Sequence, residues 1–221
     1  MYPQASKLLH PITTMCMVTS IVGTAVAAAE PYKDALAAWR RGEYATAYRL
    51  WQPLADEGDS DAQFYLGFMN EYGQGVARNG LEAIRWYRKA ADQDHAFAQF
   101  RLGDLYSSGE GSPPNDTEAA QWYRLAADQC LGGAQFNLGM MYAKGQGVPQ
   151  DRVLAHMWLN VVVSELPPLG QQQRNTAVDA LALVAAQMSP SQVAEAQQLA
   201  FQWLTEHRHL LHQKSVAAMF R

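Results

Sequence analysis

The sequence is poor in cysteine, with Cys16 and Cys130 the only two among 221 residues. Neither belongs to a Cys-x-x-Cys pair, so the sequence predicts neither a zinc scaffold nor a disulfide framework. Cys130 has no obvious base beside it, which argues against a catalytic thiol. The fold is therefore expected to be held together by packing.

A strong charge of one sign is also missing. Lys and Arg number 17 against 21 Asp and Glu, a net charge of −4, and no basic block is present that suits a run of phosphates. The sequence therefore predicts no nucleic-acid partner. With 16 glycines, 10 prolines and 48% hydrophobic residues, the composition is that of a folded soluble protein rather than a low-complexity chain.

The N-terminal segment is predicted to be a cleavable secretory signal, residues 1–29. Lys7 precedes an uncharged stretch that ends in small residues, with Ala27 and Ala29 at the positions a signal peptidase requires. Threonine, serine and glycine dilute this stretch, which favours a signal over a permanent membrane anchor. We therefore expect a periplasmic or secreted protein without stable membrane insertion after cleavage, and retention as an anchor stays the alternative.

The rest of the sequence repeats itself every 36 residues. Ala-Gln-Phe begins at Ala62, Ala98 and Ala134 and leads each time to Leu-Gly. Further columns keep the same spacing: Gly73, Gly109 and Gly145; Gly75, Gly111 and Gly147; Ala83, Ala119 and Ala155; Trp86, Trp122 and Trp158. This self-similarity indicates an array of structural repeats.

Each unit is predicted to be a pair of helices, A and B, joined by a Gly-x-Gly loop in which glycine allows positive φ. Two stripes at i, i+3, i+4 and i+7 define the helices: Gln63, Leu66, Gly67 and Asn70 in helix A, and Ala83, Trp86, Tyr87 and Ala90 in helix B. Helix B is predicted to begin at N-caps Asn79, Asn115 and Asp151, with Glu82 and Glu118 completing capping boxes.

One hairpin cannot bury both of its apolar edges, so neighbouring units are predicted to stack into an all-α solenoid of helical hairpins. The predicted boundaries are an N-terminal capping hairpin like that of tetratricopeptide repeats at residues 30–60, repeats at 61–96, 97–132 and 133–164, and a C-terminal helical cap at 165–221. Ser189-Pro190-Ser191-Gln192 is predicted to open the last helix, with serine as its cap.

These motifs resemble the Sel-one-like repeat (SLR) family, which is related to tetratricopeptide repeats. The resemblance rests on A-Q-F-x-L-G, the G-x-G loop, Asn or Asp before helix B, and A-x-x-W-Y-x-x-A-A-D-Q, over about residues 33–164. The tail M-S-P-S-Q-V-A-E-A-Q-Q-L-A is similar to the helical tail of secreted bacterial members. The resemblance implies a right-handed α-solenoid that holds protein partners together, with no shared catalytic residue. No cofactor is predicted.

The sequence departs from the family at the end of helix B. The family usually has glycine there, as at Gly58, whereas Asp94 and Cys130 stand one and two periods later. A left-handed backbone is tolerable for Asp but costs about 1 kcal/mol or more for Cys. The junction at Cys130 is therefore predicted to be either strained or rearranged around Gly132 and Gly133.

The candidate binding residues are helix A side chains that lie off the packing stripe and differ between units. We expect them on the concave surface of the solenoid, where they are free to bind a protein partner. They are Tyr65, Phe68, Tyr72, Arg101, Asp104, Ser108, Asn137, Met140 and Lys144. The first three form an aromatic strip suited to an apolar partner segment, unless Phe68 packs on the N-terminal hairpin instead.

Other aromatic and histidine residues are predicted to be structural. Phe64, Phe100 and Phe136 recur in every unit and are assigned to the core, as are the helix B tryptophans. His209 and His212, close to His207, have a spacing that can hold a metal, but no carboxylate or cysteine completes the set. A solvated helix end is the favoured interpretation, and no metal site is predicted.

The sequence thus predicts a non-enzymatic adaptor of the bacterial cell envelope that binds a protein partner on its concave face. It does not determine the oligomeric state. One alternative is a hydrolase or binder of cell-wall or β-lactam compounds, since relatives with one disulfide per hairpin are linked to that chemistry, although this sequence lacks their cysteine pairs. Another is a structural subunit of an envelope assembly, docked through its C-terminal helices.

Overall fold

The computed structural model describes residues 31–165 and 171–219, with side chains for residues 31–164 and 174–207. The predicted signal segment lies outside the described residues. Residues 31–40 are helical, and every later regular element of the described part is also a helix. These are α2 (Tyr44–Asp56), α3 (Ser60–Tyr72), α4 (Gly80–Ala91), α5 (Ala96–Ser108), α6 (Asp116–Asp128), α7 (Gly132–Lys144), α8 (Arg152–Glu165), α9 (Gln171–Ala185) and α10 (Pro190–Met219).

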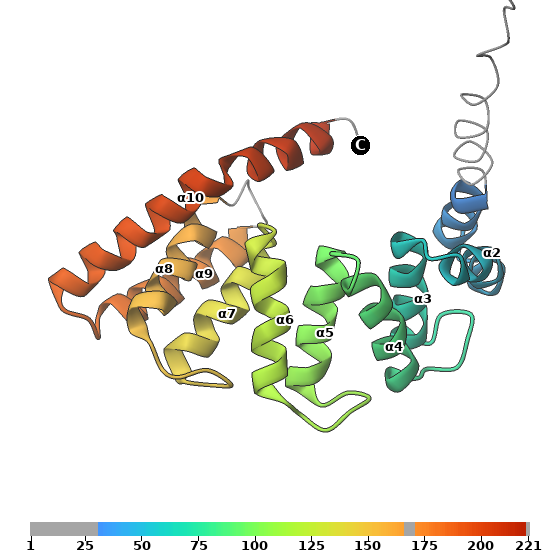
Figure 1. Cartoon of the computed structure of the whole chain (residues 1–221), viewed down its shortest axis with the longest axis horizontal. Coiled ribbons are helices and arrows are strands. Elements are labelled where there is room, and N and C mark those ends of the chain that lie inside the picture. The colour runs from blue at the N-terminus through green and yellow to red at the C-terminus, as the bar shows by residue number, and fades with distance from the viewer. Residues whose placement is uncertain (1–30, 166–170, 220–221) are drawn as a thin grey trace, which may run out of the picture.

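The helices form the predicted solenoid. Helices A and B pair as α3 with α4, α5 with α6, and α7 with α8, and each helix B also packs on the helix A that follows it (Figure 1). The pair made by residues 31–40 and α2 covers the first repeat at the N-terminal end. The prediction of an all-α array of stacked hairpins is confirmed.

The two stripes predicted from the sequence form the core. Gln63, Leu66, Gly67 and Asn70 of α3 are all buried, as are Ala83, Trp86, Tyr87 and Ala90 of α4. A Cβ atom on Gly67 would lie 2.6 Å from Cδ1 of Tyr87. Glycine recurs at this position of helix A because an aromatic ring of helix B occupies the space beside its backbone in the first two repeats.

The second glycine of each loop brings two repeats into close contact. Gly111 has φ 82°, and a Cβ atom there would lie 2.3 Å from the carbonyl carbon of Gly80, at the start of helix B in the preceding repeat. Gly75 and Gly147 meet the starts of α2 and α6 in the same way. The Gly-x-Gly column therefore serves the stacking of repeats as well as the turn within one.

The predicted N-caps are confirmed, but the capping boxes are not. The side chain of Asn79 accepts a hydrogen bond from the backbone N–H of Glu82 at 3.1 Å. The N–H of Asn79 itself donates to the carbonyl of Asn70 at 2.8 Å, which leaves no donor for the Glu82 carboxylate. Glu82 binds Arg85 instead, at 3.2 Å. At the second repeat, the side chain of Asn115 accepts from the N–H of Glu118, and the N–H of Asn115 donates to the carbonyl of Tyr106. The box is therefore absent there too.

Of the two alternatives predicted for the junction at Cys130, strain or rearrangement, the structure shows the strained, left-handed backbone. Gly58 has φ 103°, and the non-glycine residues Asp94 and Cys130 follow it at φ 61° and 60°. Helix α7 begins at Gly132, only two residues after Cys130. The left-handed conformation thus persists at every junction, whatever residue occupies it.

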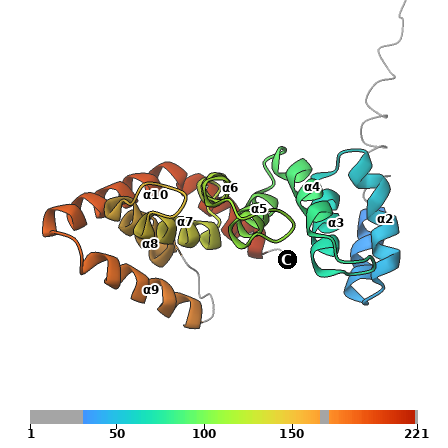
Figure 2. The ribbon, with the colours of Figure 1, turned by 90° about the horizontal axis from the view of Figure 1, so that it is seen from below.

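The C-terminal helices do not form another hairpin of the same kind. Both α9 and α10 pack on α8, and they diverge from the turn at residues 186–189 (Figure 2). Ser189 and Gln192 exchange hydrogen bonds, N–H of Ser189 to Oε1 at 2.9 Å and N–H of Gln192 to Oγ at 3.3 Å, as the predicted cap requires. In the described part, no helix is long and apolar enough to cross a membrane.

Candidate functional site

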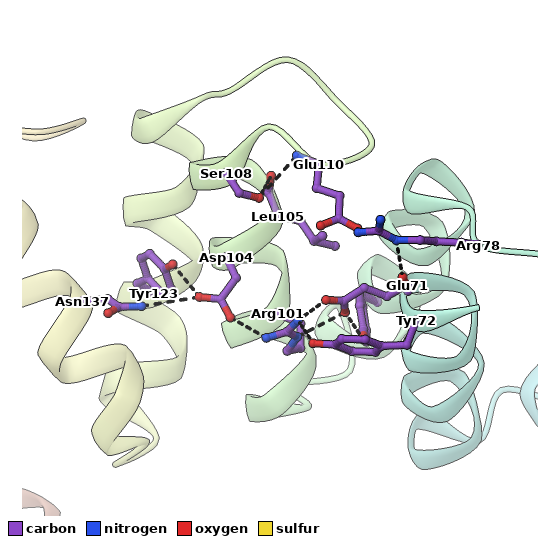
Figure 3. Close-up of polar contacts among 11 residues, drawn as sticks. Glu71, Tyr72, Arg78, Arg101, Asp104, Leu105, Ser108, Glu110, Tyr123 and Asn137 are labelled. Carbon is purple, nitrogen blue, oxygen red and sulfur yellow. Dashed lines mark hydrogen bonds and ion pairs between the residues drawn. The ribbon is translucent and has the colours of Figure 1, made fainter. Parts of the chain in front are cut away.

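Four of the nine predicted binding residues are joined in one polar network on the exposed side of helices A. Tyr72 lies at the end of α3, Arg101 and Asp104 lie on α5, and Asn137 lies on α7. Figure 3 shows their side chains converging between the three helices. They are brought together because successive helices A lie side by side, and the bonds between repeats join positions 29 and 33 residues apart, somewhat less than the 36-residue period.

Arg101 is the centre of this network. Its guanidinium donates to Asp104 Oδ2 at 2.8 Å through Nη1 and to the Tyr72 hydroxyl at 2.6 Å through Nη2. Its Nε donates to Glu71 Oε2 at 3.2 Å, and Nη2 binds the other oxygen of the same carboxylate. A two-pronged contact of this kind fixes the plane of the guanidinium as well as its position.

Sequence reasoning missed Glu71, the acidic partner of Arg101. Its side chain is buried, at 4% relative exposure, and also accepts a hydrogen bond of 2.7 Å from the Tyr87 hydroxyl. A buried carboxylate is costly unless it is paired and hydrogen-bonded, and Arg101 and Tyr87 supply both conditions. Burial, and then the charge of Glu71, raise the pKa of Tyr87. The sequence did contain a signal for Glu71: the equivalent positions of the next two repeats carry the uncharged residues Ser107 and Ala143.

Asp104 extends the network to the third repeat. Its Oδ1 accepts from the Tyr123 hydroxyl at 2.7 Å and from Nδ2 of Asn137 at 3.5 Å. Burial raises the pKa of the Asp104 carboxyl, and the hydrogen bond from Tyr123 and the charge of Arg101 oppose that rise. The network thus connects helices α3 to α7 and holds the exposed face in one arrangement.

Tyr65 and Phe68 have a different environment from the other predicted residues. The ring of Tyr65 stacks on Trp51, with centroids 4.3 Å apart and planes at 6°. Phe68 meets Trp39 edge-on, with centroids 6.2 Å apart. Phe68 therefore packs on the N-terminal hairpin, which was the alternative left open by the sequence.

The aromatic surface that remains accessible differs from the predicted strip. Tyr72 is 51% exposed, and Phe97, which the sequence analysis did not select, is 56% exposed. Phe97 lies one helical turn before Arg101 on the same face of α5. Phe97 and Tyr72 are thus the two accessible aromatic rings beside the network.

The other three predicted residues lie outside the network. Ser108 is exposed and donates to the Leu105 carbonyl at 3.3 Å. Met140 and Lys144 line a groove between α7 and α9. The nine residues therefore divide into a bridged polar centre, an aromatic contact with the N-terminal hairpin, a lone serine, and a groove at the C-terminal end.

The residues assigned to the core have that role. Trp86 and Trp158 are buried, while Trp122, Phe64, Phe100 and Phe136 are partly buried and pack against the main cluster. Among residues whose side chains are described, no group of three or more His, Cys, Asp or Glu is placed to hold a metal ion. The side chains of His209 and His212 lie outside the described residues.

Comparison with known proteins identifies the repeat. A profile of the Sel1 repeat matches residues 60–95, 96–129 and 133–160. The chain is similar to a solved Sel1 repeat protein from Oxalobacter formigenes, with TM-score 0.60 and 26% identity over 79% of this chain and 78% of that one.

A second solved structure shares the fold. It is a protective antigen of uropathogenic Escherichia coli strains that displays an SLR fold, with TM-score 0.54 and 24% identity over 77% of this chain. The chain spans 43% of the length of that antigen. No match was found among curated proteins.

Proposed function

We propose that this chain, which is a Sel1 repeat protein, is a non-catalytic adaptor of the bacterial cell envelope that binds a protein partner on the concave face formed by its helices A. Sel1 repeat proteins generally mediate protein–protein interactions, and the family is a non-enzymatic repeat scaffold. The observation that carries the proposal is the network around Arg101, which fixes the exposed side chains of three repeats in one surface.

A surface that is fixed before binding loses little conformational entropy when a partner binds. The donors of Arg101 are largely used within the network, so this residue acts mainly by positioning its neighbours. The accessible faces of Tyr72 and Phe97 and the polar groups of Ser108 and Asn137 remain to contact a partner. Specificity then resides in positions that differ between repeats, while the packing columns stay constant.

The proposal is tested by capture of partners from intact bacterial cells with a variant that alters only exposed helix A side chains. Phe97→Asp combined with Ser108→Arg changes this face without touching the network. Leu81→Asp with Gln121→Arg makes a matched change on exposed positions of helices B. Both variants should keep the helical circular dichroism of the wild type.

We expect the helix A variant to lose the crosslinked partners and the helix B variant to retain them. The reverse result, or equal loss in both variants, would reject the concave face as the binding surface. Turnover of a cell-wall or β-lactam substrate by the purified chain would reject the non-catalytic role.

The envelope location is supported by the signal pattern of residues 1–29. It is tested by fractionating cells that produce the full chain and sequencing the N-terminus of the product. A periplasmic or secreted product that begins near Glu30 is expected. A cytoplasmic product that retains residues 1–29 would contradict this part of the proposal.

A further inference from the structure

We propose that the groove between α7 and α9 binds an amphipathic helix of the partner, one that carries apolar side chains flanked by an acidic and a basic residue. This inference rests on the proposed function and specifies the chemistry of the partner at one end of the helix A face.

Six of the ten side chains that line the groove are apolar. Its volume is about 420 Å³, and it is lined by Phe136, Met140 and Ala143 of α7 and by Ala180, Leu183 and Val184 of α9. Leu183 remains 67% exposed, which is unfavourable for a large aliphatic side chain in water. A partner that covers this side chain gains the free energy of removing it from water.

The equivalent interfaces between other helices A are bridged by side chains. Arg101 connects α5 to α3 through Tyr72, and Asn137 connects α7 to α5 through Asp104. Met140 and Lys144, which continue these columns on α7, line the open groove instead. Among the described residues, the interface of α7 with α9, at the end of the helix A face, thus has space for a ligand.

The two charges at the groove select the chemistry of the ligand. Lys144 lies in the last turn of α7 and Asp179 lies on α9, and both side chains are exposed. Both line this groove, and neither forms an ion pair with a residue of the described part. A ligand with an acidic group for Lys144 and a basic group for Asp179 would satisfy both.

An amphipathic helix fits this arrangement best. Two helices form the walls, and a helix presents apolar side chains at i, i+3 and i+4 to a groove of this kind while its flanking residues reach the rims. A small apolar molecule would make no use of either charge, since both would stay hydrated.

The test uses three synthetic peptides and the purified full chain. The peptides share one apolar stripe at helical spacing and differ only in the two flanking residues, which are Glu and Lys, two Lys, or two Glu. Because a helix can lie in the groove in either direction, the number of charges of each sign is varied rather than their order. Binding is measured by fluorescence anisotropy at low ionic strength.

We expect the wild type to bind the Glu/Lys peptide most tightly. Lys144→Glu leaves two acidic residues at the groove and should transfer the preference to the Lys/Lys peptide. Asp179→Lys leaves two basic residues and should transfer it to the Glu/Glu peptide. Each matched charge should improve the dissociation constant by roughly threefold, as expected for exposed ion pairs.

Leu183→Asp should weaken binding of the Glu/Lys and Glu/Glu peptides, because it removes an apolar contact and adds an acidic group to the groove that holds Asp179. Phe201→Asp is the matched control, because Phe201 is also 67% exposed but lies on α10 and does not line the groove. Binding that ignores the charge changes, or that Phe201→Asp weakens equally, would overturn the inference. A dimer of the wild type that Leu183→Asp dissociates, as detected by sedimentation, would also overturn the inference. A second copy of the chain would then fill the groove.

The outcomes for the two proposals are separable. If no peptide binds while Phe97→Asp with Ser108→Arg still abolishes partner capture, the groove inference fails and the adaptor function stands. If the peptides follow the charge pattern but no partner is captured from cells, the adaptor function fails and the groove remains a binding site for a helix.

Discussion

Cys130 holds a backbone conformation that suits glycine better than cysteine. Its φ is 60°, and Gly58 occupies the equivalent position of the first junction. We expect Cys130→Gly to raise the free energy of unfolding by roughly 0.5–1 kcal/mol, because relief of left-handed strain exceeds the extra backbone entropy that glycine loses on folding. Urea denaturation of the purified protein measures the change.

A substitution at the equivalent glycine of the first junction, Gly58, serves as the control. Gly58 has φ 103°, and a Cβ atom added there would meet nothing within 4 Å, so Gly58→Ala should lower stability through backbone strain alone. A loss of stability in Cys130→Gly would contradict the prediction and would mean that contacts of the Cys130 side chain with the core outweigh the strain.

His156 is expected to make the stability of the protein depend on pH. Its side chain is 3% exposed, its Nδ1 has no hydrogen-bond partner among the described residues, and burial lowers its pKa. Below the ordinary histidine pKa, the unfolded chain therefore binds a proton that the folded chain does not. Stability should fall as the pH drops below about 6.5, and this contribution should level off below the lowered pKa of the folded state.

His156→Ile isolates this effect, since isoleucine stands at the equivalent position 84 of the first repeat. Unfolding free energies of the wild type and the variant are compared between pH 7.5 and pH 5 by urea denaturation. Their difference should change with pH by at most about 1.4 kcal/mol per unit. A difference that stays constant over this range would show that His156 does not titrate as inferred.

At the scale of the elements, the Gly-x-Gly loop is fixed by contact with the preceding repeat. Gly111 and Gly42 have similar φ angles, 82° and 79°, but only Gly111 lies against another backbone. Gly42→Ala should therefore lose about 1–2 kcal/mol through φ strain, and Gly111→Ala should lose a further 1–3 kcal/mol or so through overpacking. Thermal unfolding monitored by circular dichroism compares the two, and equal losses would mean that the loop moves away without cost.

Much of the fold could be predicted from the sequence because the period of 36 residues repeats every packing column. The helix stripes, the N-caps and the left-handed junctions are local features, and they are confirmed. The capping boxes failed because the donor they needed, the N–H of Asn79, binds the carbonyl of Asn70 on the preceding helix. That contact depends on how two helices pack, which helical periodicity does not specify.

The candidate site was predictable in part for the same reason. Helical position identified Tyr72, Arg101, Asp104 and Asn137 as side chains off the core stripe, and the stacking of successive helices A brought them together. Glu71 was missed because it occupies a buried position, where a carboxylate is stable only with partners from two other helices. The groove between α7 and α9 was also beyond prediction, since α9 follows the regular repeats.

At the scale of the whole molecule, each repeat is stabilised mainly by its neighbours, so the two ends determine how far a disturbance spreads. Trp51 stacks on Tyr65 at the N-terminal end, and Trp203 of α10 contacts Trp158 of α8 at the C-terminal end, with centroids 5.5 Å apart. In a solenoid, stability is close to a sum over adjacent interfaces. Loss of a contact at one end should therefore loosen the nearest repeat most.

Trp203→Ala and Trp51→Ala test this directly, because each removes a buried indole that is expected to contribute about 3–5 kcal/mol. Native-state amide hydrogen exchange should show protection falling most in α7 and α8 for Trp203→Ala, and most in α2 and α3 for Trp51→Ala. The central helices α5 and α6 should change less in both variants. A uniform fall of protection along the chain in either variant would mean instead that the array unfolds as one cooperative unit, in which the network around Arg101 couples the repeats more strongly than nearest-neighbour packing predicts.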